Sequence, residues 1–195
     1  MNHHQFFDQA AAEWDALEVE ETLIRLREIV AGLDIVPGAA VLDVGAGTGV
    51  LVPLLLEATG GEGRIMALDI SGEMLRQAQA KGYPVEYVQG DAENLPLRDE
   101  AFDWAICNAV FPHFPHKLRA LGEICRVLRS GGRLVICHTA SRQAINEFHR
   151  SMGGVVAHDT IPDEGEMLRL LQEAGLVEAQ VRDEPDCYLI LARRN

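Results

Sequence analysis

The sequence has little basic charge, no closely spaced cysteine pair and no long apolar run, and each absence excludes a class of protein. It carries 17 lysines and arginines against 30 aspartates and glutamates, a net charge of −13, whereas binding to a nucleic-acid backbone needs a basic face. Without a C-x-x-C pair, zinc-knuckle and thioredoxin-like sites are not expected, and scattered cysteines suit a reducing compartment. No signal peptide or membrane-length segment is visible. We therefore expect a cytoplasmic chain that binds neither nucleic acid nor a membrane.

Length and patterning favour a single α/β domain over residues 1–195, because 48% hydrophobic content is ample for one core. Strand-like and helix-like segments alternate through the first half, which predicts a parallel sheet with right-handed crossovers. The last two strands, 176–182 and 187–193, are joined only by Asp183–Asp186 and must be antiparallel. Apolar stripes predict a helical N-terminal arm within residues 1–30.

Three alternating glycines follow an apolar strand in the run Val41–Gly49, and this is the most specific feature of the chain. A glycine turn between a parallel strand and a helix, expected here at 48–58, is the usual nucleotide site of an open sheet. Position 50 is valine, so the spacing is not that of the G-x-G-x-x-G dinucleotide fingerprint. Asp43 would repel a pyrophosphate but suits a ligand with an amino group and a sulfonium. A plain tight turn is the alternative interpretation.

Polar or small side chains also follow the other predicted strands, where ligands of such sheets bind. Asp69 and Ile70 follow the second strand and suit a ribose and an adenine face, while Asp91 follows the third and suits an adenine amine. Asn108 ends the fourth strand and His138 the fifth. Two purely structural roles stay open: Asp69 could cap a helix, and Asp91 could form an Asx-turn.

The chain resembles the small single-domain, class I S-adenosylmethionine-dependent methyltransferases of the type 11-like kind. The resemblance rests on VLDVGAGTG, ALDIS, GDAENLPL, FDWAICNAVFPHF and LGEICRVLRSGGRLVICH, and covers about residues 37–140 in detail. It implies a Rossmann-like three-layer sandwich with a seven-stranded, mostly parallel sheet of order 3-2-1-4-5-7-6 and an antiparallel strand 7. One departure is Ser130, where relatives often carry proline before the glycines of an expected sharp turn.

The same resemblance implies the cofactor, S-adenosylmethionine, and the residues around it. Asp43 with the loop residues Gly45, Ala46 and Gly47 would surround its methionine part. The ribose would lie on Asp69, Ile70 would flank adenine, and Asp91-Ala92 would meet its edge. Asn108 would begin the loop that lines the sulfur. The N-terminal FFDQAAAEWD is similar to the lid helix that these enzymes fold over the cofactor.

The acceptor is expected to be a small molecule, because the chain has no substantial addition to the cofactor fold beyond the arm and an insert at 139–162. The candidate catalytic residues are His113 and His138, acting as a base or orienting the acceptor. The candidate acceptor contacts are Phe111, His116, Arg142, His149 and His158. Surface histidines, a general base and a metal site are the open interpretations. No metal ligand is predicted, because no histidine pair lies at i, i+4 on a helix.

Two rival functions remain at this point. A cofactor-binding or regulatory protein without activity would keep the same fold, because fold does not fix function. A nicotinamide-dependent oxidoreductase is less favoured, since Asp43 and Val50 do not suit a phosphate. The sequence leaves the oligomeric state, monomer or homodimer, and the acceptor atom open.

Overall fold

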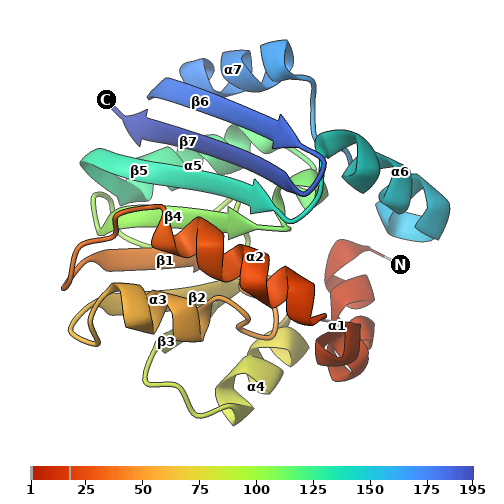
Figure 1. Ribbon diagram of the computed structural model, residues 1–195, viewed down its shortest axis with the longest axis horizontal. Coiled ribbons are helices and arrows are strands. Elements are labelled where there is room, and N and C mark those ends of the chain that lie inside the picture. Colours follow the sequence, from red (N-terminus) through yellow and green to blue (C-terminus); the bar gives the residue numbers. More distant parts are fainter. Residues whose placement is uncertain (1, 18) are drawn as a thin grey trace.

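The computed structural model describes residues 2–17 and 19–195, so Met1 and Glu18 of the predicted arm lie outside it. Its centre is a seven-stranded sheet of order β3-β2-β1-β4-β5-β7-β6, in which β7 runs antiparallel to both neighbours and the remaining pairs are parallel (Figure 1). The predicted fold class and strand order are confirmed. The strands are β1 Ala40–Val44, β2 Arg64–Asp69, β3 Glu86–Gln89, β4 Phe102–Asn108, β5 Leu128–His138, β6 Leu176–Glu184 and β7 Cys187–Arg194.

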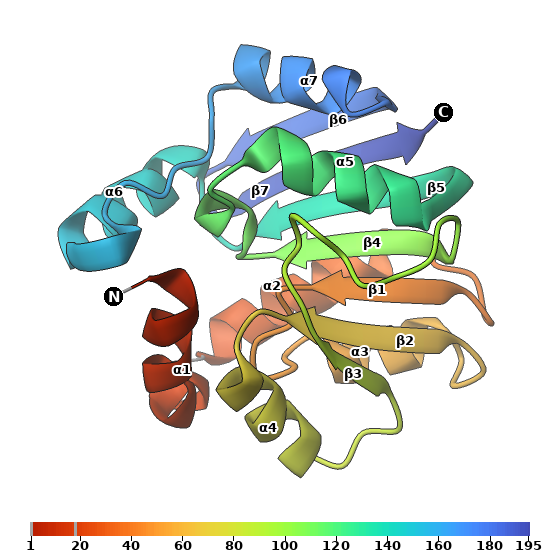
Figure 2. The same cartoon turned by 180° about the vertical axis from the view of Figure 1, so that it is seen from behind.

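Helices cover both faces of this sheet. Helices α2 and α3 lie on one face and α5 and α7 on the other, while α1 and α6 stand beyond the carboxyl ends of β1, β4 and β5 (Figures 1 and 2). No helix in the described part of the chain is both long and apolar enough to cross a membrane. The helices are α1 His3–Trp14, α2 Glu20–Ala31, α3 Val52–Ala58, α4 Gly72–Ala80, α5 Lys117–Val127, α6 Arg142–Met152 and α7 Glu164–Glu173, with 3-10 turns η1 Asp15–Leu17, η2 Phe111–His113 and η3 Gly154–Val156.

Alternation along the central strands builds a core on each face of the sheet. In β1, Val41 packs in the layer that contains Leu55 of α3, whereas Leu42 packs in the layer that contains Leu121 of α5. Because successive side chains of a strand point to opposite faces, a strand that is buried on both sides is apolar throughout. The single charged residue of β1, Asp43, is therefore a costly exception within the core.

Two local predictions differ from the structure. Helix α3 begins at Val52 rather than at 48, because the glycine loop continues as turns to residue 51. The sharp turn expected at 130–132 lies inside β5. Phe102 of β4 pairs with Leu128 of β5, but Trp104, only two residues later, pairs with Arg133. The extra β5 residues form a bulge, which glycine accommodates through a positive φ.

Candidate functional site

The glycine loop after β1 uses the conformational freedom of its glycines. Gly45, Gly47 and Gly49 have φ values of 70°, 54° and 83°, a region that side chains disfavour. A Cβ atom on Gly45 would lie 2.3 Å from the nearest side-chain carbon of Val110. The loop therefore passes directly beside the segment that follows β4, and the carboxyl ends of the two strands form one site.

The N–H groups of the first three loop residues are bonded within the protein. Gly45 and Ala46 both donate to the carbonyl oxygen of Leu68, at 2.7 and 2.9 Å. Gly47 donates to the Asp69 carboxylate at 2.8 Å. A phosphate-binding loop keeps such donors free for its ligand, so the arrangement does not present a phosphate cradle.

Two buried carboxylates lie next to the loop. Asp43 is 1% exposed, and its Oδ2 atom has no hydrogen-bond partner among the described residues. Burial, together with the charge of Asp69, raises the pKa of Asp43 to about 7. Burial also raises the pKa of Asp69, although that carboxylate accepts hydrogen bonds from the N–H groups of Ser71 and Gly47. An unpaired buried carboxylate is costly, and a cationic ligand would compensate it.

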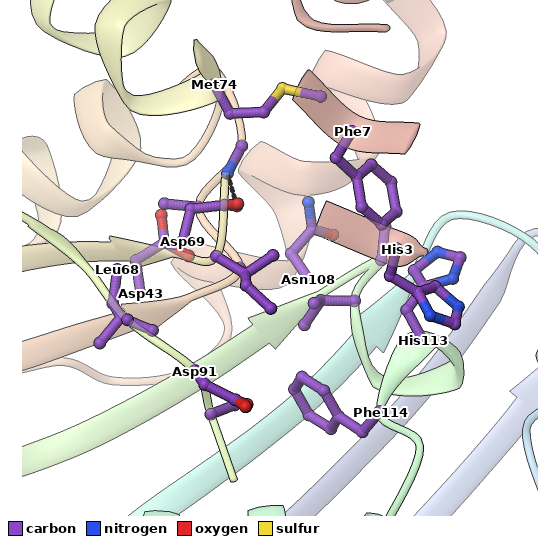
Figure 3. Close-up of a pocket in the computed structure, with 18 of the residues that line it drawn as sticks. His3, Phe7, Asp43, Leu68, Asp69, Met74, Asp91, Asn108, His113 and Phe114 are labelled. Carbon is purple, nitrogen blue, oxygen red and sulfur yellow. Dashed lines mark hydrogen bonds between the residues drawn. The ribbon is translucent and has the colours of Figure 1, made fainter. Parts of the chain in front are cut away.

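A cavity of about 260 Å³ opens beside these carboxylates. Asp43 and Asp69 lie on one side of it, Asp91 below them, and His3 and His113 on the opposite side (Figure 3). The structure brings every predicted cofactor residue to the wall of this one cavity. They are Asp43, Gly45, Ala46, Gly47, Asp69, Ile70, Asp91, Ala92 and Asn108.

The Asp91 carboxylate also has a local role. Its Oδ1 atom accepts from the backbone N–H of Glu93 at 2.8 Å, which is the Asx-turn that the sequence left open. Ile70, 36% exposed, offers an apolar surface at the wall of the cavity. The turn and the contact with a ligand are compatible, because a carboxylate has several acceptor sites.

Helix α1 covers the cavity and contributes His3, Phe7 and Trp14 to its wall. Polar contacts with α4 hold the helix in place: the Ser71 hydroxyl donates to Asp8 at 2.6 Å, and Asp15 pairs with Lys81 at 2.8 Å. Few α1 residues are buried. A helix held by surface polar contacts rather than by core packing can open at little cost in free energy.

Comparison with known proteins decides the family. A model described as "Methyltransferase domain" matches residues 42–136, the stretch that contains the glycine loop and the ends of β2, β3 and β4. This match, together with the strand order of the sheet, supports a class I S-adenosylmethionine-dependent methyltransferase family. A demethylmenaquinone methyltransferase of Staphylococcus epidermidis is 31% identical over 152 residues, covering 74% of this chain but only 63% of that longer protein. The corresponding Staphylococcus aureus protein is 26% identical over 209 residues, covering 92% and 86%.

Solved methyltransferase structures share the fold over almost the whole chain. A SAM-dependent methyltransferase from Thermotoga maritima has a TM-score of 0.79 at 22% identity and covers 98% of this chain and 99% of that one. One from Aquifex aeolicus has a TM-score of 0.77 at 23% identity, with 95% and 98% covered. These similarities extend the match in fold beyond the motif region to both ends of the chain.

The two histidines predicted to be catalytic lie in different environments. His113 lines the cavity, and its Nδ1 atom lies 2.6 Å from Oδ2 of Asp159. His138 is buried and does not line the cavity, and its Nε2 atom has no partner among the described residues. Burial, with His113 and His149 nearby, lowers the pKa of His138 to about 3. Its imidazole is therefore neutral at physiological pH and lies behind the site.

Most of the predicted acceptor residues lie away from the cavity wall. Phe111 is fully buried in the core, because η2 turns its side chain under the loop. The backbone N–H of Arg142 donates to Asp183 and its guanidinium faces the same carboxylate. His158 is exposed. His149 is buried against His113, with ring centroids 4.9 Å apart. Of the five predicted acceptor residues, only His116 lines the cavity, where it pairs with Glu93.

Sequence reasoning missed two residues at the histidine end of the site: His3, which lines the cavity, and Asp159, which pairs with it. His3 precedes the predicted lid motif, and Asp159 lies in the insert between two polar residues. The two meet in the site: Oδ2 of Asp159 is 2.8 Å from Nε2 of His3 and 2.6 Å from Nδ1 of His113. No local pattern signals contacts that join residues 156 positions apart. An acidic residue within a histidine-containing insert is the one weak signal in the sequence.

Proposed function

We propose that this chain transfers the methyl group of S-adenosylmethionine to a small acceptor. The observation that carries the proposal is the unpaired, buried Asp43 carboxylate at the wall of the cavity. The family implies this cofactor, whose amino group and sulfonium are cationic, and a desolvated carboxylate without a partner suits such a ligand. The residues present therefore fit it.

The glycine loop disfavours a dinucleotide cofactor. The N–H groups of Gly45, Ala46 and Gly47 already donate to Leu68 and Asp69. A pyrophosphate would meet two buried carboxylates, and the N–H groups of these three residues are not free to bind it, which is the opposite of what phosphate binding requires. This arrangement supports the methyl donor over the nicotinamide alternative.

We infer the following positions for the cofactor. Asp43 and the glycine loop would hold its methionine part, and the remaining acceptor sites of Asp69 would take the ribose hydroxyls. Ile70 and Met74 offer apolar surface for the adenine ring, and Asp91 offers an acceptor for its amine. In this arrangement the sulfur would lie on the Asn108 side of the cavity, toward the histidines.

The protein's contribution to catalysis would be orientation and the exclusion of water. The bound cofactor supplies a methyl group that is already activated on a sulfonium. Closure of α1, with Phe7 and Trp14 at the wall, would hold the acceptor in line with the departing sulfur and keep solvent out. Orientation of this kind lowers a barrier by about 7–11 kcal/mol in favourable cases.

A small acceptor suits the dimensions and lining of the site. The cavity, about 260 Å³, is covered by α1, which suits a small acceptor better than a folded macromolecule. Its histidine end carries the apolar rings of Phe7 and Phe114. The demethylmenaquinone methyltransferases among the relatives make a hydroxylated aromatic ring a reasonable first acceptor to test.

Turnover tests the proposed function. We expect the purified chain to form S-adenosylhomocysteine from S-adenosylmethionine when a suitable phenol, hydroquinone or thiol is supplied, and to form almost none without an acceptor. Product formation is measured by chromatography against a mixture without protein. Tight cofactor binding with no turnover over a broad acceptor panel would contradict methyl transfer and favour a binding or regulatory protein.

A further inference from the structure

Three segments that are distant in the sequence meet at the histidine end of the cavity. His3 comes from the first turn of α1, His113 from η2 after β4, and Asp159 from the segment after η3. One atom from each residue, His3 Nε2, His113 Nδ1 and Asp159 Oδ2, lies within 4.8 Å of the other two. His3 and His113 are shown together at the cavity wall in Figure 3.

The segment that carries Asp159 is fixed by buried polar side chains of α6. The Asn146 amide accepts from the N–H of Ile161 at 2.8 Å and donates to its carbonyl oxygen at 3.0 Å. His149 lies 2.8 Å, through Nδ1, from the carbonyl oxygen of Asp159. Since a carbonyl only accepts, Nδ1 of His149 carries the proton. Supporting bonds of this kind are what orient the ligands of a metal site.

The donor set matches that of an open metal site. Two imidazoles and one carboxylate are the protein ligands of hydrolytic zinc centres and of the facial iron triad, both of which keep further positions free. With metal–ligand bonds of about 2.0–2.2 Å, ligand atoms at a tetrahedral centre are separated by about 3.3 Å. To reach this separation, the two contacts of Asp159, 2.8 and 2.6 Å, need to lengthen by about 0.5 and 0.7 Å.

We propose that His3, His113 and Asp159 bind a divalent transition-metal ion of the Zn²⁺ class, with its open position on the cavity side. Only the role of the ion in the reaction rests on the proposed function. In that role, the ion holds the acceptor hydroxyl or thiol in its deprotonated, anionic form. The acceptor releases its proton to solvent, and its oxygen or sulfur bonds to the methyl carbon. The carbon–sulfur bond of the cofactor breaks at the same time, with the electron pair going to sulfur. Because His3 belongs to α1, the ion also fastens the covering helix to the acceptor side.

The test uses the full chain without an affinity tag, stripped with EDTA and titrated with Zn²⁺ by calorimetry and with Co²⁺ by visible absorption. We expect one ion per chain and the d–d spectrum of a nitrogen- and oxygen-ligated Co²⁺. His3→Ala and Asp159→Asn should each weaken binding by more than about 100-fold, since even outer-shell partners contribute roughly 10–100-fold. His3→Ala changes only the first turn of a surface helix, so it separates lost ligation from misfolding.

Two neighbouring histidines provide matched controls. His4 and His158 are adjacent in sequence to the proposed ligands and lie outside the cavity wall, so the double variant His4→Ala/His158→Ala removes imidazoles without touching the site. It should bind the metal within about twofold of wild type. Absence of stoichiometric binding in the wild type, or equal losses in control and triad variants, would overturn the metal site. Binding of S-adenosylhomocysteine to the EDTA-treated wild type, measured separately, tests the proposed function independently.

Discussion

Replacing Asp43 by asparagine should make the unliganded protein more stable and its binding of S-adenosylhomocysteine roughly 10- to 100-fold weaker. The stability rises because the substitution removes a buried charge that has one oxygen without a partner. The affinity falls because a hydrogen bond to a charged group contributes about 1.5–3 kcal/mol, and each 1.4 kcal/mol is about tenfold. Thermal melting and calorimetry on the same preparation measure the two effects.

The size of the stability effect depends on pH. The pKa of Asp43 is about 7 in the folded chain against 3.8 as the reference value, so between these values the folded state binds more protons than the unfolded state. The free energy of unfolding therefore falls as pH rises through this window, by on the order of 4 kcal/mol, and stays low above it. The asparagine side chain of the variant does not titrate, so the advantage of Asp43→Asn should grow from acidic pH to about 7 and then level off.

Asp103→Asn is the matched control, because Asp103 accepts a backbone N–H at the other end of β1 and lies outside the cavity. It should lower stability slightly and leave the affinity for S-adenosylhomocysteine within about twofold. An Asp43→Asn protein that binds as tightly as wild type would refute the assignment of Asp43 to the cationic part of the cofactor.

Asp69→Ala should weaken binding of S-adenosylhomocysteine at least roughly tenfold and also destabilise the protein. Its carboxylate accepts N–H groups from Gly47 and Ser71, so the variant leaves two donors without their acceptor, at about 1–3 kcal/mol for a buried group. The ribose would lose its acceptor as well. Calorimetry gives the affinity, and urea unfolding gives the change in stability.

A comparison of fragments separates the two roles of Asp69. If the ribose lies on this carboxylate, Asp69→Ala should lower the affinities for adenosine and for S-adenosylhomocysteine by similar factors. The affinity for methionine alone should change little. Equal losses of affinity for methionine and for adenosine would mean that the substitution acts only by disordering the glycine loop. Asp103→Ala again serves as the control for loss of an acceptor of a backbone N–H. We expect it to leave the affinities for both ligands unchanged.

The fold, and the meeting of the predicted cofactor residues at one cavity, could be predicted from the sequence for one physical reason. In a parallel sheet, the residues that follow each strand meet at one edge, so a local pattern at Asp43, Asp69 and Asp91 translates directly into a shared cavity. The antiparallel hairpin follows from loop length in the same way. Whether these residues bind the cofactor stays a prediction that the experiments above test.

The acceptor side could not be predicted in this way. His3 and Asp159 meet because α1 packs beside η3 and the segment that follows it, and no local period encodes a contact over 156 positions. The position of Phe111 in an apolar loop predicts a cavity residue, but its side chain is buried in the core because η2 turns it inward. The 130–132 turn became a bulge because β4 continues to pair on both sides of it.

Calorimetric titration of the wild-type chain with S-adenosylhomocysteine and, separately, with NAD, above the pKa of Asp43, shows whether the cavity is built for a cationic sulfur nucleoside or for a dinucleotide. We expect stoichiometric binding of the sulfur nucleoside and no measurable heat with the dinucleotide, because buried carboxylates line the pocket and the N–H groups of Gly45, Ala46 and Gly47 are already bonded within the protein. Tight binding of NAD with none of S-adenosylhomocysteine would contradict this expectation.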